Sequence, residues 1–152
     1  METKPYINKL LGKLSLLPVV FALALGWHTA NAEDSSSEVT EQVLDHHLAA
    51  FGSLDMDAIL ADYTDDSTIL TPGGAVKGLA DIRSAFEGLF AEFGKPGTTF
   101  EMQQKIIEGN VAYIVWHAET ADNVYELGTD TFVVRDGKIA VQSFTPKTTS
   151  KN

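Results

Sequence analysis

Apolar residues recur every three to four positions in three stretches of the chain, which is the spacing of amphipathic helices. The first stretch ends at Gly52, the second begins at Asp55, a helix-capping residue type, and the third runs from Gly78 to Gly94. The apolar positions are Val39, Val43, Leu44, Leu48 and Phe51, then Ile59, Leu60 and Tyr63, then Leu79, Ile82, Phe86, Leu89, Phe90 and Phe93. The pattern predicts three helices that each bury one face.

The rest of the pattern is typical of β-strands. Residues 67–71 are β-prone, and Pro72-Gly73-Gly74 after them predicts a tight reversal into a short second strand. Four longer strands are predicted at 98–108, 111–120, 124–134 and 138–145. Gly109-Asn110 and Asp136-Gly137 fit two-residue hairpin turns, so the long strands are expected to form an antiparallel sheet.

The order of elements predicts one α+β domain over residues 38–146, because helices precede a sheet and do not alternate with strands. Residues 33–37 are polar and serine-rich, and we expect a short flexible leader there. Residues 147–152 are polar as well, and we expect a frayed tail.

The N-terminal segment has the features of a signal peptide. Three lysines precede an apolar run over residues 14–27, and Ala30-Asn31-Ala32 fits the small-residue pattern of a signal peptidase site. Removal of residues 1–32 would give a periplasmic or secreted protein. The alternative is a membrane anchor, but the run contains Pro18 and is shorter than the roughly 18 residues that a spanning helix needs.

Charge and composition narrow the classes of partner and cofactor. The chain has 21 acidic and 11 basic residues, a net charge of −10, and no basic cluster, which argues against nucleic acid and anionic membranes as partners. It has no cysteine and therefore no disulfide. Neither a metal-ligand spacing nor a nucleotide-binding glycine pattern is present, so we expect no metal and no cofactor.

Several short motifs resemble the nuclear transport factor 2-like superfamily, in particular its SnoaL-like and ketosteroid-isomerase-like branch. They are Leu54-Asp55, Tyr63-x-Asp65-Asp66, Thr71-Pro72-Gly73, Gly78-x-x-x-Ile82-x-x-x-Phe86, Val134-x-Asp136-Gly137-Lys138-Ile139 and Gln142-x-Phe144. The resemblance implies a cone-shaped roll, in which a strongly curved sheet wraps three helices and leaves a deep, mostly apolar pocket. It also implies homodimers formed through the outer face of the sheet.

The chain departs from ketosteroid isomerase at each catalytic position. The general-base Asp is replaced by Thr71, whose hydroxyl does not accept a proton near neutral pH. By alignment without gaps, the oxyanion Tyr falls on His47 and the protonated acid falls on Thr131, beside Asp130. The steroid-isomerase mechanism is therefore not expected.

His47 is the first candidate for a catalytic residue. It lies one helical turn from Val43 and from Phe51, so it shares their apolar face, and an imidazole there can transfer a proton or bind a ligand carbonyl. The alternative is a buried histidine satisfied by a protein group. The resemblance adds Tyr63, Thr71, Trp116, Thr131, Gln142 and Phe144 as ligand-binding candidates, and we expect Asp130 to face away from the pocket.

The register of the strand at 111–120 decides which of two neighbours reaches the pocket. The resemblance favours Trp116 inside and His117 on an apolar outer face, whereas a one-residue bulge would turn His117 inward beside His47. Only the second register makes a two-histidine metal site conceivable.

Three functions fit these features. The first is a binding protein for a small apolar or amphipathic molecule. The second is an isomerase, lyase or cyclase in which His47 transfers a proton, and the third is a structural dimer module with a collapsed cavity. Loss of the Asp at Thr71 together with an apolar pocket wall favours the first.

Overall fold

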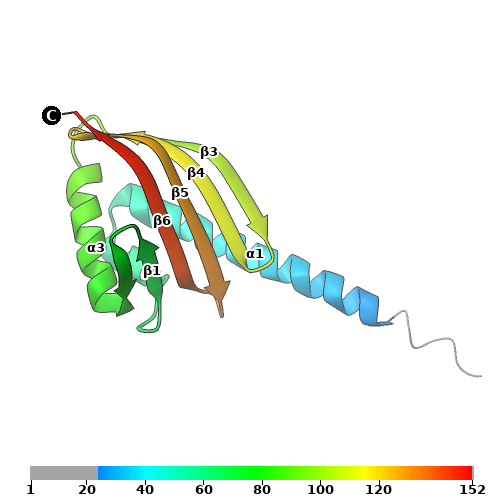
Figure 1. Cartoon of the computed structure of the whole chain (residues 1–152). Coiled ribbons are helices and arrows are strands. Elements are labelled where there is room, and N and C mark those ends of the chain that lie inside the picture. Colours follow the sequence, from blue (N-terminus) through cyan, green and yellow to red (C-terminus); the bar gives the residue numbers. More distant parts are fainter. Residues whose placement is uncertain (1–23, 152) are drawn as a thin grey trace, which may run out of the picture.

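The computed structural model describes residues 24–151, with side chains from residue 33, and shows three helices packed in a curved six-stranded sheet (Figure 1). The helices are α1 Ala24–Ser53, α2 Met56–Leu60 and α3 Gly78–Phe93. The strands are β1 Thr68–Thr71, β2 Gly74–Lys77, β3 Thr99–Glu108, β4 Val111–Glu119, β5 Asn123–Arg135 and β6 Lys138–Ser150. The predicted α+β cone is confirmed.

The sheet is mixed, in the order β2-β1-β6-β5-β4-β3. All neighbouring strands are antiparallel except β1 and β6, which are parallel. Both predicted hairpin turns are present, because Glu108 pairs with Val111 and Arg135 pairs with Lys138. In these two turns Gly109, Asp136 and Gly137 have positive φ angles of 54°, 52° and 70°. The residue types at these positions therefore predicted the turns correctly. The parallel pairing of β1 with β6 joins the β1–β2 hairpin to the sheet of four long strands.

Bulges bend the long strands around the helices. The register shifts between Met102 and Gln104 where β3 pairs with β4, and between Trp116 and Ala118 where β4 pairs with β5. It shifts twice where β5 pairs with β6, between Tyr125 and Leu127 and between Val133 and Val134. The concave face is buried against α1 and α3. The largest completely enclosed side chains are Phe132, Leu44, Ile59, Ile82 and Ile139.

The inner face of β4 settles the register question. Ala112, Ile114, Trp116 and Ala118 are all buried, so Trp116 points inward and His117 points to the outer face. The bulge at this point takes its extra residue from β5, and the alternation along β4 is kept. The alternative register, with His117 beside His47, is wrong.

The predicted leader at 33–37 is part of α1 in the structure. Two side chains of this helix bind the β3–β4 turn: Ser37 Oγ accepts a bond of 3.0 Å from the Gly109 amide, and Thr40 Oγ1 donates one of 2.9 Å to the Gly109 carbonyl. These bonds fix α1 to the sheet. The serine-rich composition alone did not reveal them.

The predicted frayed tail at 147–152 is wrong for its first residues, because β6 continues to Ser150 and pairs with β5 as far as Asn123. Lys151 then donates its amide to Asp122 O at 2.8 Å. Strand pairing orders this polar segment.

Most of the predicted signal peptide, residues 1–23, lies outside the described residues. The backbone of residues 24–32 belongs to α1. Within residues 24–151, no helix has the length and apolar character needed to cross a bilayer.

Candidate functional site

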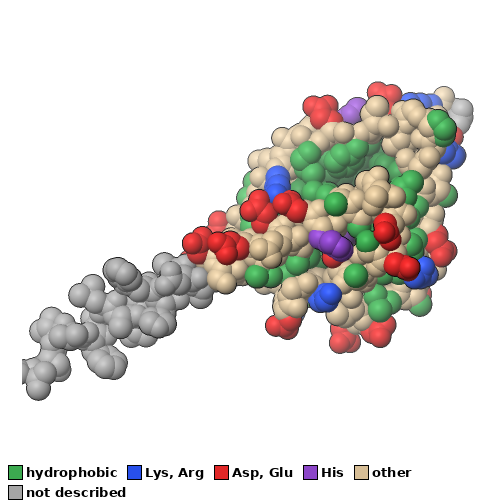
Figure 2. Space-filling model, turned by 180° about the vertical axis from the view of Figure 1, so that it is seen from behind, with side chains coloured by type: hydrophobic (Ala, Val, Ile, Leu, Met, Phe, Trp, Pro, Cys, Tyr) green, Lys and Arg blue, Asp and Glu red, His purple; other side chains and the backbone are tan. Residues whose placement is uncertain are grey.

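A cavity of about 730 Å³ lies between α1, α3 and the concave face of the sheet. Its walls are mostly apolar, and the space-filling view shows a hollow lined with hydrophobic side chains (Figure 2). The apolar lining includes Leu48, Phe51, Ile69, Leu89, Phe93, Phe100, Met102, Trp116, Phe132 and Phe144. The collapsed interior considered as the third possibility is therefore absent.

Asp130 brings a carboxylate to this apolar wall. It is 5% exposed and lies on the same face of β5 as buried Phe132 and Val134. Trp116 Nε1 donates to Asp130 Oδ2 at 2.8 Å, and Gln142 Nε2 donates to Asp130 Oδ1 at 2.8 Å. Each carboxylate oxygen keeps a second lone pair, so a donor group in the cavity can still bind.

Burial raises the pKa of the Asp130 carboxyl group above its ordinary value. The hydrogen bonds from Trp116 and Gln142 and the charge of His47 act in the opposite direction, but desolvation outweighs them. Asp130 is therefore more easily protonated than a surface aspartate, which suits a group that exchanges protons with a bound molecule.

Gln142 and Tyr63 orient the Asp130 carboxylate through a chain of hydrogen bonds. The Tyr63 hydroxyl donates to Gln142 Oε1, which turns the Gln142 amide group towards Asp130. Burial raises the pKa of Tyr63 well above its ordinary value, with further increases from the charges of Asp130 and Asp62. Gln142 lines the cavity but Tyr63 does not, so Tyr63 supports the site and is not placed to contact a ligand.

Trp116 owes its position to a glycine that the sequence analysis missed. Gly128 pairs with Trp116 across β4 and β5, and a Cβ atom at Gly128 would lie 2.1 Å from the indole ring. The ring of Trp116 stacks on Phe100 at 5.4 Å and on Phe144 at 6.3 Å between centroids. An isolated glycine inside a strand pattern was the available signal, because it often marks a close approach.

His47 lines the cavity from α1 and is 3% exposed. Its ring makes edge contacts with Tyr63, Phe86 and Phe132, whose centroids lie 5.7, 5.9 and 5.2 Å away. The apolar stripe of α1 therefore carries His47 towards the sheet.

Two threonines, Thr131 and Thr71, have roles in the structure that differ from those predicted from the sequence. Thr131 lies opposite Tyr113 on the outer face of the sheet, so its placement in the pocket is wrong, and Asp130 occupies the inward position. Thr71 does line the cavity, but its hydroxyl donates to Gly74 O at 3.0 Å and accepts from Gly73 N at 3.1 Å. The Thr71 hydroxyl mainly fixes the β1–β2 turn.

Across residues 33–151, no group of three or more His, Cys, Asp or Glu side chains is arranged to hold a metal ion. The polar groups at the cavity are those of His47, Thr71, Asp130 and Gln142, with Lys95 and Thr98 also in the lining. These groups can donate or accept hydrogen bonds and protons.

Comparisons with known proteins agree with this fold. A family model described as SnoaL-like domain matches residues 44–142. A search of curated protein sequences found no match.

Many solved structures share the architecture. One is a nuclear transport factor 2-like protein of unknown function from Burkholderia xenovorans LB400, with 21% identity, a TM-score of 0.62, and coverage of 74% of this chain and 85% of that one. A proposed ketosteroid isomerase from Kribbella flavida has 15% identity, a TM-score of 0.60 and coverage of 72% and 78%. An LEH-like epoxide hydrolase from Mycobacterium tuberculosis has 15% identity, a TM-score of 0.58 and coverage of 72% and 84%.

Proposed function

Because the chain belongs to the SnoaL-like domain family, we propose that its cavity binds a small, largely apolar molecule that carries one hydrogen-bonding group. The observation that carries the proposal is the Asp130 carboxylate, held by Trp116 and Gln142 in the wall of an otherwise apolar cavity of about 730 Å³. A cavity of this size and character is typical of small-molecule sites. No cofactor is needed for such binding.

The chemistry of the cavity wall supports one class of ligand. Burial of an apolar ring system against Phe51, Phe93 and Trp116 supplies most of the free energy of binding, at roughly 25 cal/mol for each Å² removed from water. A hydroxyl group on the ligand then donates to a free lone pair of Asp130. We therefore expect a polycyclic alcohol or phenol to bind more tightly than its ether.

This expectation can be tested with 2-naphthol and 2-methoxynaphthalene, which differ in one donor. Calorimetric titration should show 2-naphthol binding at least about tenfold more tightly, since a hydrogen bond to a charged group contributes roughly 1.5–3 kcal/mol and each 1.4 kcal/mol is a factor of ten. Asp130→Asn should remove most of this preference, whereas Asp66→Asn, on the exposed α2–β1 segment, should keep it. Equal affinity of both probes for the unaltered protein, or no binding of either, would refute the proposal.

A second function is favoured by the proximity of two proton-exchanging groups. His47 and Asp130 both line the cavity, and the raised pKa of Asp130 suits proton transfer. In an isomerase, lyase or cyclase, His47 would take a proton from a carbon next to a carbonyl group, and a protonated Asp130 would donate a hydrogen bond to the carbonyl oxygen as negative charge develops there.

The enzyme proposal predicts catalysed hydrogen exchange at an activated carbon. NMR in D₂O should show faster loss of the α-protons of 2-tetralone with the protein than with buffer. His47→Gln should return the rate to that of buffer, whereas His117→Gln, on the outer sheet face, should retain the increase. Binding of 2-tetralone without any increase in the exchange rate would be consistent with the binding function and would refute the enzyme function.

We also propose that the protein is a homodimer and that it is exported. The outer face of the sheet presents a half-buried apolar row from neighbouring strands, including Tyr113, Val115, Val133 and Val141, which supports self-association. The lysine-led apolar segment before Ala32 supports cleavage and a periplasmic or secreted location. N-terminal sequencing of the protein from the expressing cell should begin at Glu33, and a start at Met1 would contradict cleavage.

A further inference from the structure

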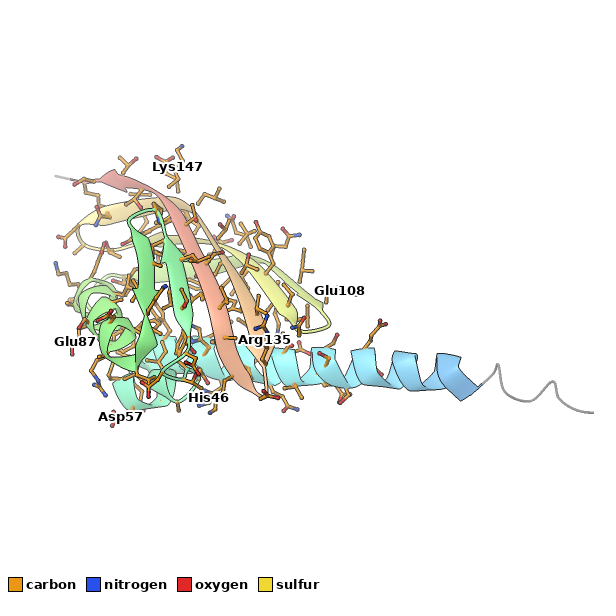
Figure 3. The ribbon with its side chains drawn as sticks, turned by 60° about the horizontal axis from the view of Figure 1, so that its bottom comes forward. His46, Asp57, Glu87, Glu108, Arg135 and Lys147 are labelled. Atoms are coloured by element: carbon orange, nitrogen blue, oxygen red, sulfur yellow. The ribbon has the colours of Figure 1, made fainter. Side chains whose placement is uncertain are left out.

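A second polar cluster lies beside His47, between α1 and the segment that joins α2 to β1. Asp62, between α2 and β1, is nearly buried, and its two oxygens face two consecutive histidines of α1. His46 Nδ1 lies 2.6 Å from Asp62 Oδ1, and His47 Nδ1 lies 3.4 Å from Asp62 Oδ2. His46 is half-exposed at the surface of α1 (Figure 3), so the cluster reaches from solvent to the cavity.

The backbone holds Asp62 in this position. Its amide donates to Ile59 O at 3.2 Å, and its carbonyl accepts from the Ile139 amide at 2.8 Å. Lys138 Nζ donates to the neighbouring Ala61 carbonyl at 2.6 Å. The start of β6 therefore fixes the segment that presents the carboxylate to α1.

Among the described residues, two buried side-chain polar atoms lack a hydrogen-bond partner, and they are His47 Nδ1 and Asp62 Oδ2. They face each other, so each is the group that can satisfy the other. A carboxylate oxygen only accepts, and a lone pair on Nδ1 would be repelled by it. The hydrogen of a neutral His47 ring therefore belongs on Nδ1.

We propose that Asp62 is a positioning residue that holds His47 in the Nδ1–H tautomer and so presents Nε2 to the cavity as a hydrogen-bond acceptor. The same argument places a hydrogen on His46 Nδ1, which donates to the other oxygen of Asp62 and keeps the carboxylate from rotating. The functional consequence of this tautomer rests on the proposed function. A hydrogen-bond donor of the ligand can bind to His47 Nε2 as well as to Asp130, or Nε2 can take a proton from the ligand.

The tautomer is measured directly by a two-bond ¹H–¹⁵N correlation spectrum of the ring nitrogens at pH 8. Single His→Asn variants assign the signals. In the unaltered protein we expect Nδ1 of His47 to be protonated and Nε2 to be unprotonated. Protonation of Nε2 with an unprotonated Nδ1 would overturn the proposal.

The Asp62→Asn variant supplies a second readout. Asparagine has one carbonyl oxygen and one amide group, so it can accept from only one of the two histidines, and the other must become the Nε2–H tautomer. Asp57→Asn, which changes an exposed carboxylate near Arg83, should leave both tautomers unchanged. Both rings remaining Nδ1–H in Asp62→Asn would show that Asp62 does not set them. If that variant does not fold, the spectrum of the unaltered protein still decides.

The outcome is separable from that of the proposed function. A His47 ring in the Nδ1–H form, in a protein that fails to bind 2-naphthol, would leave the positioning role intact and refute ligand binding. Binding of 2-naphthol to a protein whose His47 is in the Nε2–H form would support ligand binding and refute the positioning role of Asp62.

Discussion

At the scale of single residues, the site depends on how closely Trp116 approaches the backbone of β5. The indole lies over Gly128, and this approach lets Nε1 reach Asp130 Oδ2 at 2.8 Å. A side chain on Gly128 would occupy the space of the ring. One backbone position therefore controls the orientation of the carboxylate.

Gly128→Ala tests this dependence. The new Cβ would lie 2.1–2.4 Å from three indole atoms, so Trp116 must move and its bond to Asp130 must break. We expect a loss of about 1–3 kcal/mol in the free energy of unfolding, as for other overpacked sites. Urea denaturation measures the loss, and the Trp116 indole N–H signal should shift.

Gly88→Ala is the matched control, because nothing lies within 4 Å of a Cβ there and the residue is exposed in α3. It should stabilise the protein by up to about 1 kcal/mol, owing to the helix propensity of alanine. Equal stability of the two alanine variants would contradict the packing argument.

The residue scale also shows where sequence reasoning succeeds. The helical stripe of α1 placed His47 correctly, because burial along a helix follows from spacing alone. The inward position in β5 was assigned to Thr131 and belongs to Asp130. The bulge near Leu127 changes the phase of the strand, and it depends on the partner strands β4 and β6. No local signal in the residues themselves fixes that phase.

At the scale of elements, α3 is joined to the β4–β5 hairpin by one carboxylate. Glu92 accepts hydrogen bonds from Thr120 Oγ1 at 3.0 Å, Asn123 Nδ2 at 2.6 Å and Tyr125 OH at 2.8 Å. Desolvation by burial raises the pKa of the Glu92 carboxyl group, but the three hydrogen bonds together outweigh it, so the pKa is lowered from its ordinary value. The bonds stabilise the end of α3 next to the cavity, where Phe93 and Gly94 form part of the lining.

Glu92→Gln should reveal this link through its pH dependence. A carboxyl group with a lowered pKa in the folded state stabilises the protein fully above its unfolded pKa of about 4.3, and the stabilisation disappears as the pH falls through the folded value. At pH 7 we expect the variant to lose about 1 kcal/mol of unfolding free energy, a modest value because solvent screens this half-buried group.

Chemical denaturation at pH 7 and pH 3 measures this difference, which should shrink at pH 3. Glu87→Gln, on the exposed face of α3, should show little change at either pH. A loss of the same size at both pH values would show that charge on Glu92 is not responsible.

Whole elements were predictable to the extent that their signals are local. The turns at Gly109 and Asp136 follow from residue types that accept positive φ, and the helices follow from periodicity. The last part of β6 could not be predicted, because residues 146–150 are mostly polar and become a strand by pairing with residues 123–128 of β5. Their order arises from the partner strand.

At the scale of the whole molecule, shape and charge act against each other in the proposed dimer. The curved sheet turns its apolar outer row away from the helices, where a second copy can cover it. The net charge of −10 makes two copies repel at low ionic strength. We therefore expect the dimer to dissociate more readily in dilute buffer than in concentrated salt.

Sedimentation velocity in 0.1 M and 1 M NaCl tests this expectation. Repulsion acts over a Debye length of about 10 Å in the first and about 3 Å in the second, so the dimer fraction at a given protein concentration should rise with salt.

Val133→Glu, in the centre of the outer row, should give a monomer under both conditions, because the carboxylate would be buried without a partner. Ala91→Glu adds the same charge to an exposed position of α3 and should lower the dimer fraction only in 0.1 M NaCl, since charge at a distance is screened and an interface charge is not. A Val133→Glu protein that sediments like the unaltered protein would place the contact elsewhere.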